Sequence, residues 1–95
     1  MGFEWDDEKA DANEAKHGVS FIEAATVFGD PLALTFEDLL HSLEEDRFLT
    51  IGLSSAGRAL IVSHTDRGAE TRIISARLAS RGEGKGYEDG DYPRA

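Results

Sequence analysis

The feature that most constrains the fold is a run of three apolar segments, at residues 47–53, 59–65 and 71–76, separated by very short connections. Each segment is rich in the aliphatic and β-branched residues that favour strands. The connections at residues 54–57 and 66–68 each contain a glycine, which accepts the positive φ angle of a tight turn. Connections of this length join neighbouring antiparallel strands. The run therefore predicts an antiparallel meander.

Two helices are predicted before the meander. An acidic N-cap pair and a glycine C-cap bound the first helix, over residues 7–17. Ser20 and Glu23 have the spacing of a capping box, in which each side chain satisfies a backbone N–H of the helix start. The second helix therefore begins at Ser20, and it ends before Pro31 because proline cannot continue the helical hydrogen bonds.

Two further strands complete the predicted sheet. Phe3 and Trp5 at alternate positions predict a short strand, and an apolar run predicts another at residues 32–36. Residues 37–46 are acidic, and we expect an exposed loop with one helical turn there. The order of one strand, two helices and four strands is typical of an α+β fold, with two N-terminal helices packed on a mostly antiparallel sheet. The other face of that sheet must be covered or functional.

The C-terminal segment is rich in glycine. Three glycines at alternate positions follow the last strand, and each weakens a helix by about 1 kcal/mol relative to alanine. We therefore expect a short or frayed C-terminal helix. The predicted organisation is one domain over residues 1–81 and a flexible, glycine-rich acidic tail over residues 82–95.

Charge is distributed unevenly along the chain. The sequence holds 19 Asp and Glu against 10 Lys and Arg, a net charge of −9, which excludes a uniformly basic nucleic-acid-binding surface. Residues 1–50 contain 13 acids and 3 bases, whereas residues 51–95 contain 6 acids and 7 bases. An anion-binding patch can therefore exist if the later segments share a face. The lack of cysteine excludes disulfides, and the acidic start is unlike a secretory signal, so we expect a cytoplasmic protein.

Few side chains are candidates for chemistry. The histidines lie far apart without metal-ligand spacing, and the sequence contains no phosphate-binding loop or serine-nucleophile motif. The last strand of the meander carries Arg72 and Arg77, which a period of two places on opposite faces, and His64 stands on the neighbouring strand. Arginine suits the charge of a reacting phosphate, and histidine suits proton transfer. In the alternative interpretation, His64 caps a strand end and Arg72 pairs with local acids.

Two stretches of the sequence are specific enough to indicate relatives: KHGVSF at residues 16–21 and RIISAR at residues 72–77. Further positions that match the same pattern are Phe3, Glu4, Trp5, Asp6, Lys9, Asn13, Ala24, Phe28, Asp30, Pro31, Arg47, Thr50, Ile51, Gly52, Val62, His64 and Thr65. With these residues the chain resembles the BrnT family of bacterial type II toxins over residues 3–81.

This resemblance implies a fold, an activity and a partner. The fold would be RelE-like, and the activity a metal-independent and cofactor-free endoribonuclease that inhibits translation. The partner would be a BrnA-type antitoxin whose ribbon-helix-helix domain binds DNA, so that the toxin meets DNA only through the antitoxin. Toxin and antitoxin would form a heterotetramer in the cytoplasm, with no role for a membrane.

The candidate site residues follow from the resemblance together with the chemistry of the side chains. We expect Arg72 and Arg77 to stabilise the phosphate during cleavage and His64 to act as acid or base. Residues expected to contact RNA are Lys9, Lys16, His17 and Arg81.

The segment after RIISAR departs from the family's pattern, which continues into a helix rich in arginine and lysine. Here it contains three glycines, with only Arg81 and Lys85 as cations, and fewer phosphate contacts weaken RNA affinity. One alternative function is therefore a homologue that binds the antitoxin and acts as co-repressor without cleaving RNA. Another is an unrelated small enzyme on the same α+β scaffold, because a fold does not determine function.

Overall fold

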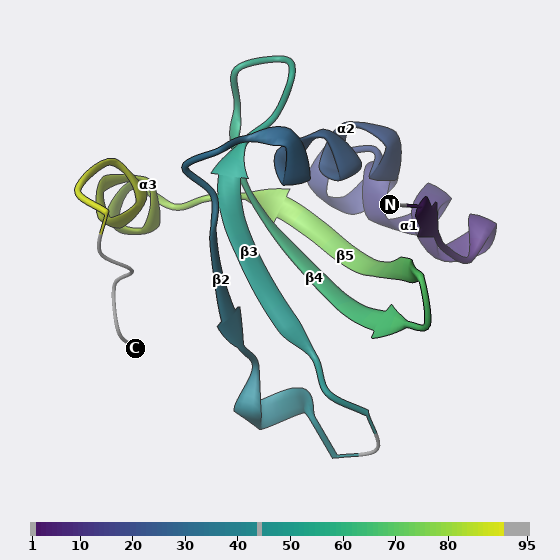
Figure 1. The fold of residues 1–95 in the computed structure, drawn as a ribbon. Helices are drawn as coiled ribbons and strands as arrows, with labels where there is room; N and C mark the ends of the chain where they lie inside the picture. Colours follow the sequence, from purple (N-terminus) through teal and green to yellow (C-terminus); the bar gives the residue numbers. More distant parts are fainter. Residues whose placement is uncertain (1, 44, 91–95) are drawn as a thin grey trace.

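A five-stranded sheet in the order β1-β5-β4-β3-β2 organises residues 2–43 and 45–90, which the computed structural model describes (Figure 1). The strands are β1 (Gly2–Glu4), β2 (Leu34–Glu37), β3 (Phe48–Leu53), β4 (Ala59–Arg67) and β5 (Glu70–Leu78). Strands β2 to β5 pair antiparallel in chain order, and β1 pairs parallel with β5. The predicted α+β class and the meander are confirmed.

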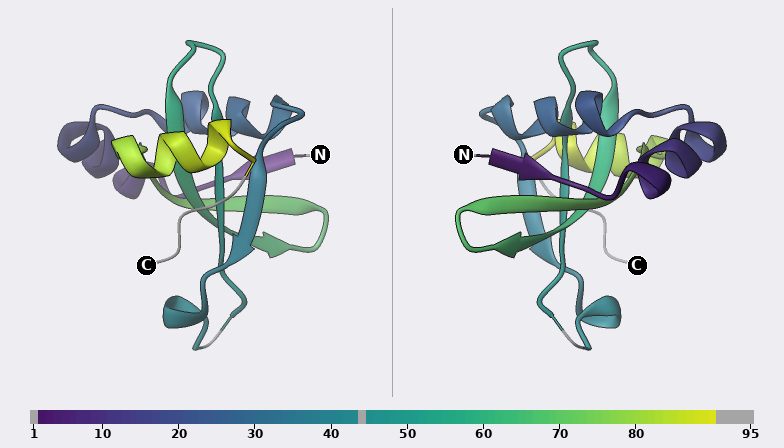
Figure 2. Two further views of the ribbon diagram at one scale, coloured as in Figure 1. Left: turned by 90° about the vertical axis from the view of Figure 1, so that its left-hand side faces the viewer. Right: turned by 90° about the vertical axis from the view of Figure 1, so that its right-hand side faces the viewer.

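Helices lie on both faces of the sheet. Helix α1 (Asp7–His17), helix α2 (Phe21–Thr26) and the short 3-10 helix η1 (Val27–Gly29) lie on one face. Helix α3 (Arg81–Glu88) lies on the other, as the two opposite views of Figure 2 show. A second 3-10 helix, η2 (Leu39–His41), lies in the acidic segment between β2 and β3, where one helical turn was expected.

Two apolar clusters hold these layers together. The larger lies between the sheet and the N-terminal helices, with Phe21, Leu60 and Ile73 among its buried members. The smaller packs Tyr87 of α3 on the opposite face of the sheet, against Ile51 and Ile61. Burial of this kind is the main favourable contribution to folding, at roughly 25 cal/mol per Å² of apolar surface.

Helix α3 extends into the segment that we expected to be a flexible tail from residue 82. Ser80 and Glu83 form a complete capping box at its start, and Tyr87 near its end donates a hydrogen bond to Asp30. That hydrogen bond and burial raise the pKa of Tyr87 to about 12. The cap and this anchor compensate for the glycines of the helix. The rest of the expected tail, residues 91–95, lies outside the described residues.

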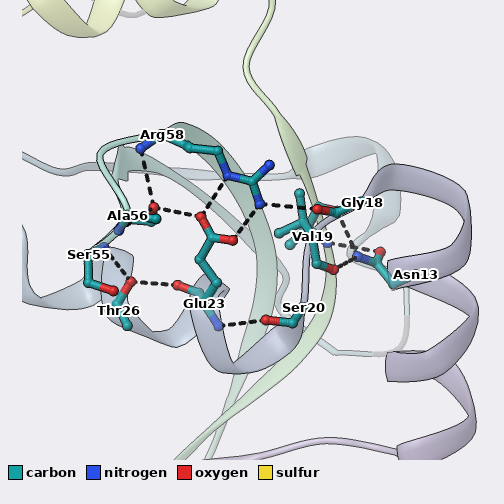
Figure 3. A network of polar contacts seen from close by, with 11 residues as sticks. Asn13, Gly18, Val19, Ser20, Glu23, Thr26, Ser55, Ala56 and Arg58 are labelled. Atoms are coloured by element: carbon teal, nitrogen blue, oxygen red, sulfur yellow. Dashed lines mark hydrogen bonds and ion pairs between the residues drawn. The ribbon is translucent and has the colours of Figure 1, made fainter.

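The start of α2 is capped as predicted, but only in part. The Ser20 hydroxyl accepts from the Glu23 N–H at 3.0 Å. The Glu23 carboxylate does not reach back to Ser20; it accepts hydrogen bonds from Arg58 and from Ser54 in the β3–β4 turn (Figure 3). Arg58 also donates to the Gly18 carbonyl. The pKa of Glu23 is lowered chiefly by the Arg58 hydrogen bond, so the carboxylate is a charged link between α2 and the hairpin.

Asn13 of α1 forms hydrogen bonds with the backbone of β5 where that strand has no neighbouring strand among the described residues. Strand β1 pairs only with residues 70–72, so within the described chain the later part of β5 has no strand on that side. The Asn13 amide donates to the Ala76 carbonyl at 2.8 Å and accepts from the Ala76 N–H at 3.1 Å. It also donates to the Val19 carbonyl at 3.0 Å. One buried side chain therefore joins α1, the α1–α2 connection and β5.

His64 is a core residue on the face covered by the N-terminal helices, only 5% exposed. Its ring stacks on Phe48 and meets Phe28 edge-on, with ring centroids 5.8 and 4.8 Å away. Its Nε2 shares a 2.7 Å hydrogen bond with the Thr50 hydroxyl. Burial lowers the pKa of His64, although the Asp66 carboxylate acts in the opposite direction. The imidazole is therefore held neutral in the core.

We predict that Asn13→Ala destabilises the fold by about 3 kcal/mol, because it leaves two backbone groups of Ala76 and one of Val19 buried without partners. Urea unfolding measures the change. The control is Glu14→Ala, an exposed neighbour on the same helix, which should change stability by less than about 0.5 kcal/mol. Equal losses for the two variants would contradict the role assigned to Asn13.

We predict a loss of stability on acidification that depends on His64. Folding lowers the pKa of His64 below its ordinary value of 6.5. At a pH between the folded and the unfolded pKa, the unfolded chain therefore binds more protons than the folded one. The free energy of unfolding therefore falls as the pH drops below about 6.5 and levels off beneath the folded pKa. Urea unfolding at a series of pH values across this range measures the change in the free energy of unfolding. His64→Gln has no ring to protonate and should lose less over the same range; an equal loss would count against the prediction.

Candidate functional site

An irregularity in strand pairing decides which side chains of β5 share a face. Ser63 of β4 pairs with Ser75, but the next residue, His64, pairs with Ile73, so β5 has one extra residue at this point. Such a β-bulge reverses the alternation of side chains beyond it. Arg72 and Arg77 consequently lie on the same face, opposite the N-terminal helices, and not on opposite faces as a period of two predicts.

The structure does not gather the three expected catalytic residues in one pocket. His64 is buried on the other face of the sheet. Arg72 lies beside β1, where its guanidinium is 3.6 Å from a carboxylate oxygen of Glu4, as the alternative interpretation expected. The partners of Arg72 and Arg77 on β4 are four positions apart, about 13 Å along the strand. In the structure the two guanidinium groups are held by different carboxylates, Arg72 by Glu4 and Arg77 by Glu83, and do not converge on one site.

An open hollow of about 420 Å³ lies on the face that carries Arg77, beside the part covered by α3. Its polar lining consists of Asp38, His41, Arg47, Ser63, Ser75 and Arg77, and its apolar lining of Leu40, Leu49 and Ile74. We call it the arginine hollow. The hydroxyls of Ser63 and Ser75, neighbours across β4 and β5, make no hydrogen bond within the described residues. The hollow therefore combines two guanidinium groups, one imidazole and two available hydroxyls.

His41 is the histidine of this hollow, and it is not among the predicted site residues. Its Nδ1 lies 2.9 Å from Oδ2 of Asp38, three residues earlier, and its side chain is 63% exposed. A carboxylate on one ring nitrogen orients the imidazole and leaves the other nitrogen for a substrate. A feature of the sequence that indicates this site is the spacing of Asp38 and His41, three residues apart in the one helical turn predicted for the exposed acidic loop.

Arg47 contributes a guanidinium that is only partly satisfied. Its Nε is buried and, in the described part of the chain, has no hydrogen-bond partner. Oε1 of Glu45 is 3.9 Å from this nitrogen, which makes an ion pair without a hydrogen bond. A buried N–H without a partner is costly. The Arg47 side chain as a whole is 35% exposed and lines the hollow.

Arg77 is held by a carboxylate from α3. Its two terminal nitrogens donate to the two oxygens of Glu83 at 2.8 and 2.9 Å. The same carboxylate closes the capping box of α3. The hydrogen bonds from Arg77 are the main cause that lowers the pKa of Glu83 to about 2. The guanidinium is therefore fixed in position and largely neutralised in the free protein.

The residues expected to contact RNA do not lie together. Lys9, Lys16 and His17 are on α1, on the face of the sheet opposite the arginine hollow. Arg81 is exposed at the first turn of α3, on the same side of the sheet as the hollow but outside its lining. Lys16 and His17 lie in the last turn of α1, where positive charge complements the helix dipole.

Metal-binding and membrane-spanning features are not found in the described residues. No group of three or more His, Cys, Asp or Glu is placed to hold a metal ion there. No helix in residues 2–43 or 45–90 has the length and apolar composition needed to cross a bilayer.

Two comparisons with known proteins indicate the same family. The family model of the ribonuclease toxin BrnT of type II toxin–antitoxin systems matches residues 5–83. Among solved structures, the ribonuclease toxin BrnT of Brucella abortus is similar with a TM-score of 0.66 and 27% sequence identity, over 85% of this chain and 99% of that one. A search of curated proteins finds no significant match. The chain belongs to the BrnT family, the ribonuclease toxins of type II toxin–antitoxin systems.

Proposed function

We propose that this chain is an endoribonuclease toxin that inhibits translation and binds its RNA substrate in the arginine hollow. The observation that carries the proposal is the presence of His41, Arg47 and Arg77 in one open hollow of the sheet face. RNA presents phosphate groups and 2′-hydroxyls to a protein, and guanidinium and imidazole groups are suited to both. Family membership supplies the reaction class.

The proposed reaction is attack of a ribose 2′-hydroxyl on the adjacent phosphate, which breaks the bond to the 5′-oxygen of the next nucleotide. His41 Nε2 takes the proton of the 2′-hydroxyl, because Asp38 holds the other ring nitrogen. Arg47 and Arg77 stabilise the extra negative charge on the phosphate. The leaving oxygen takes a proton from water or from the protonated imidazole. The proposed reaction requires no metal ion.

The expected residues take different parts in this proposal. Arg77 keeps its role at the phosphate, whereas His64 supports the core and Arg72 holds β1 through Glu4. Arg81, on the first turn of α3, would contact RNA next to the hollow. Lys9, Lys16 and His17 would contact only a substrate long enough to reach the opposite face.

The proposal includes the antitoxin that membership of a type II family implies. We propose a BrnA-type partner whose ribbon-helix-helix domain binds DNA, and a heterotetramer of toxin and antitoxin in the cytoplasm. The net charge of −9 supports a basic antitoxin segment as the contacting part.

A second candidate function is antitoxin binding and co-repression without RNA cleavage. One observation favours it: each cation of the arginine hollow faces an acid, with Glu83 at Arg77, Asp38 at His41 and Glu45 near Arg47. RNA must compete with these carboxylates, and fewer free cations reduce the electrostatic part of RNA affinity. Cleavage of RNA by the purified chain distinguishes the two functions.

We predict that His41→Ala reduces the rate of RNA cleavage about 100-fold and that Arg77→Ala reduces it by a similar factor, from loss of the base and of charge stabilisation. Single-turnover cleavage of a labelled RNA in EDTA measures both. The control is Arg72→Ala, a residue of the same strand and face outside the hollow, which should leave the rate within about threefold. If the wild type does not cleave, or cleaves only with a metal, the proposed reaction is wrong.

We predict that Glu83→Gln increases RNA affinity severalfold, because it removes a negative charge beside Arg77 that opposes the phosphate. At neutral pH the carboxylate is fully ionised, since its pKa is about 2. Fluorescence anisotropy with a short labelled RNA at low salt measures the change. The control is Glu88→Gln, an exposed acid at the other end of α3. Equal gains for the two variants would mean that only net charge matters and that the Arg77–Glu83 pair does not restrain binding.

A further inference from the structure

Three exposed leucines gather in the segment between β2 and β3. Leu39, Leu40 and Leu43 expose 76, 86 and 94% of their surface. The other large apolar residues exposed in the described chain occur at separate places in the sequence: Ile22, Leu32, Leu53 and Leu78. Single exposed leucines are ordinary on a protein surface, whereas a cluster of them marks an interaction site.

Leu40 and Leu43 of this cluster line a hollow of their own, and Leu39 is next to Leu40 in the sequence but outside the lining. Leu40, His41, Leu43, Glu45 and Arg47 line an open hollow of about 290 Å³, which we call the leucine hollow. Sites for small organic ligands generally begin at about 300 Å³ and enclose most of the ligand. An open hollow of this size suits one or two apolar side chains of a partner protein better than a free metabolite.

The charge around the leucines indicates what kind of partner fits. Residues 37–46 contain five acids and no Lys or Arg. Of these acids, Glu37 and Asp46 are exposed, and neither forms an ion pair within the described residues. Apolar contacts flanked in the sequence by two carboxylates without ion pairs are complementary to a segment in which Leu, Ile or Phe alternate with Lys or Arg.

We propose that the leucine hollow and the acids around it are the docking site of a basic amphipathic segment of the antitoxin. The inference rests on the antitoxin partner of the proposed function and adds where that partner binds. The occupant is the antitoxin because it is the partner that a type II family implies. A second copy of this chain is disfavoured, because two acidic segments would repel each other.

Docking at this place has a direct consequence for RNA. The leucine hollow and the arginine hollow share Leu40, His41 and Arg47. A segment seated on the leucines therefore covers the imidazole and one guanidinium of the proposed RNA site. The basic residues of the segment would also form ion pairs with Asp38 and Glu45, the carboxylates next to His41 and Arg47. The antitoxin would inhibit the toxin by direct exclusion of RNA.

The test measures binding of the protein encoded by the reading frame adjacent to this chain's own. Leu39→Ser/Leu43→Ser should weaken its affinity at least about tenfold by isothermal titration calorimetry, because it removes two exposed anchors that line no part of the arginine hollow. The matched control is Ile22→Ser, an equally exposed apolar residue on the opposite face, which should bind like the wild type.

A second variant tests the charge. Glu37→Lys/Asp46→Lys should slow association severalfold at low salt, and the difference should shrink as salt is added. Its control is Asp11→Lys/Glu14→Lys, which reverses the same number of charges on α1. Equal slowing by both pairs would mean that only net charge attracts the partner and would overturn the assigned surface.

The outcomes separate this inference from the proposed function. Unchanged affinity of the double leucine variant, or weakening by Ile22→Ser instead, overturns the docking site while RNA cleavage by the chain alone still supports the toxin. No binding of the adjacent gene product by the wild type overturns both the docking site and the partner. Weakened binding by the leucine variant, with cleavage equal to that of the wild type, supports the inference.

Discussion

The bulge in β5 is the constraint on which the rest of the structure depends. Strand β5 has one extra residue between the residues that pair with Ser63 and His64, and Ile73 and Ala76 both face the N-terminal helices as a result. Without it, one of these core residues would point to the opposite face, and Arg77 would point toward the helices. The same irregularity therefore completes the main core and exposes the guanidinium of the arginine hollow.

Much of the fold could be predicted from the sequence because local signals and tertiary packing agree there. The first helix has its predicted bounds, and the turn glycines Gly57 and Gly68 have positive φ angles. The site was predicted less well, because its geometry depends on non-local facts. The bulge has no signature in RIISAR, and the burial of His64 requires Phe28 and Phe48 to close on it. The RelE-like class is still a prediction.

The charges of the arginine hollow are balanced within the free protein. Arg77 is bound to Glu83, and the carboxylate that holds it also caps α3, so the pair fixes both a helix and a guanidinium. The pair is partly exposed, so its contribution to stability is modest, about 0 to 1 kcal/mol. Its main effect is on the hollow, because Arg77 must leave its carboxylate or share it to make the proposed contact with a phosphate.

The parallel pairing of β1 with β5 affects how the chain is made. Gly2 pairs with Glu70, so β1 has no strand to pair with until β5, which follows the other four strands in the described chain, is synthesised. Closing a loop of this length is slow compared with forming local contacts. A truncated or nascent chain that lacks β5 lacks Arg77 as well, and with it the intact hollow. The arginine hollow is therefore complete only after β5 has emerged from the ribosome.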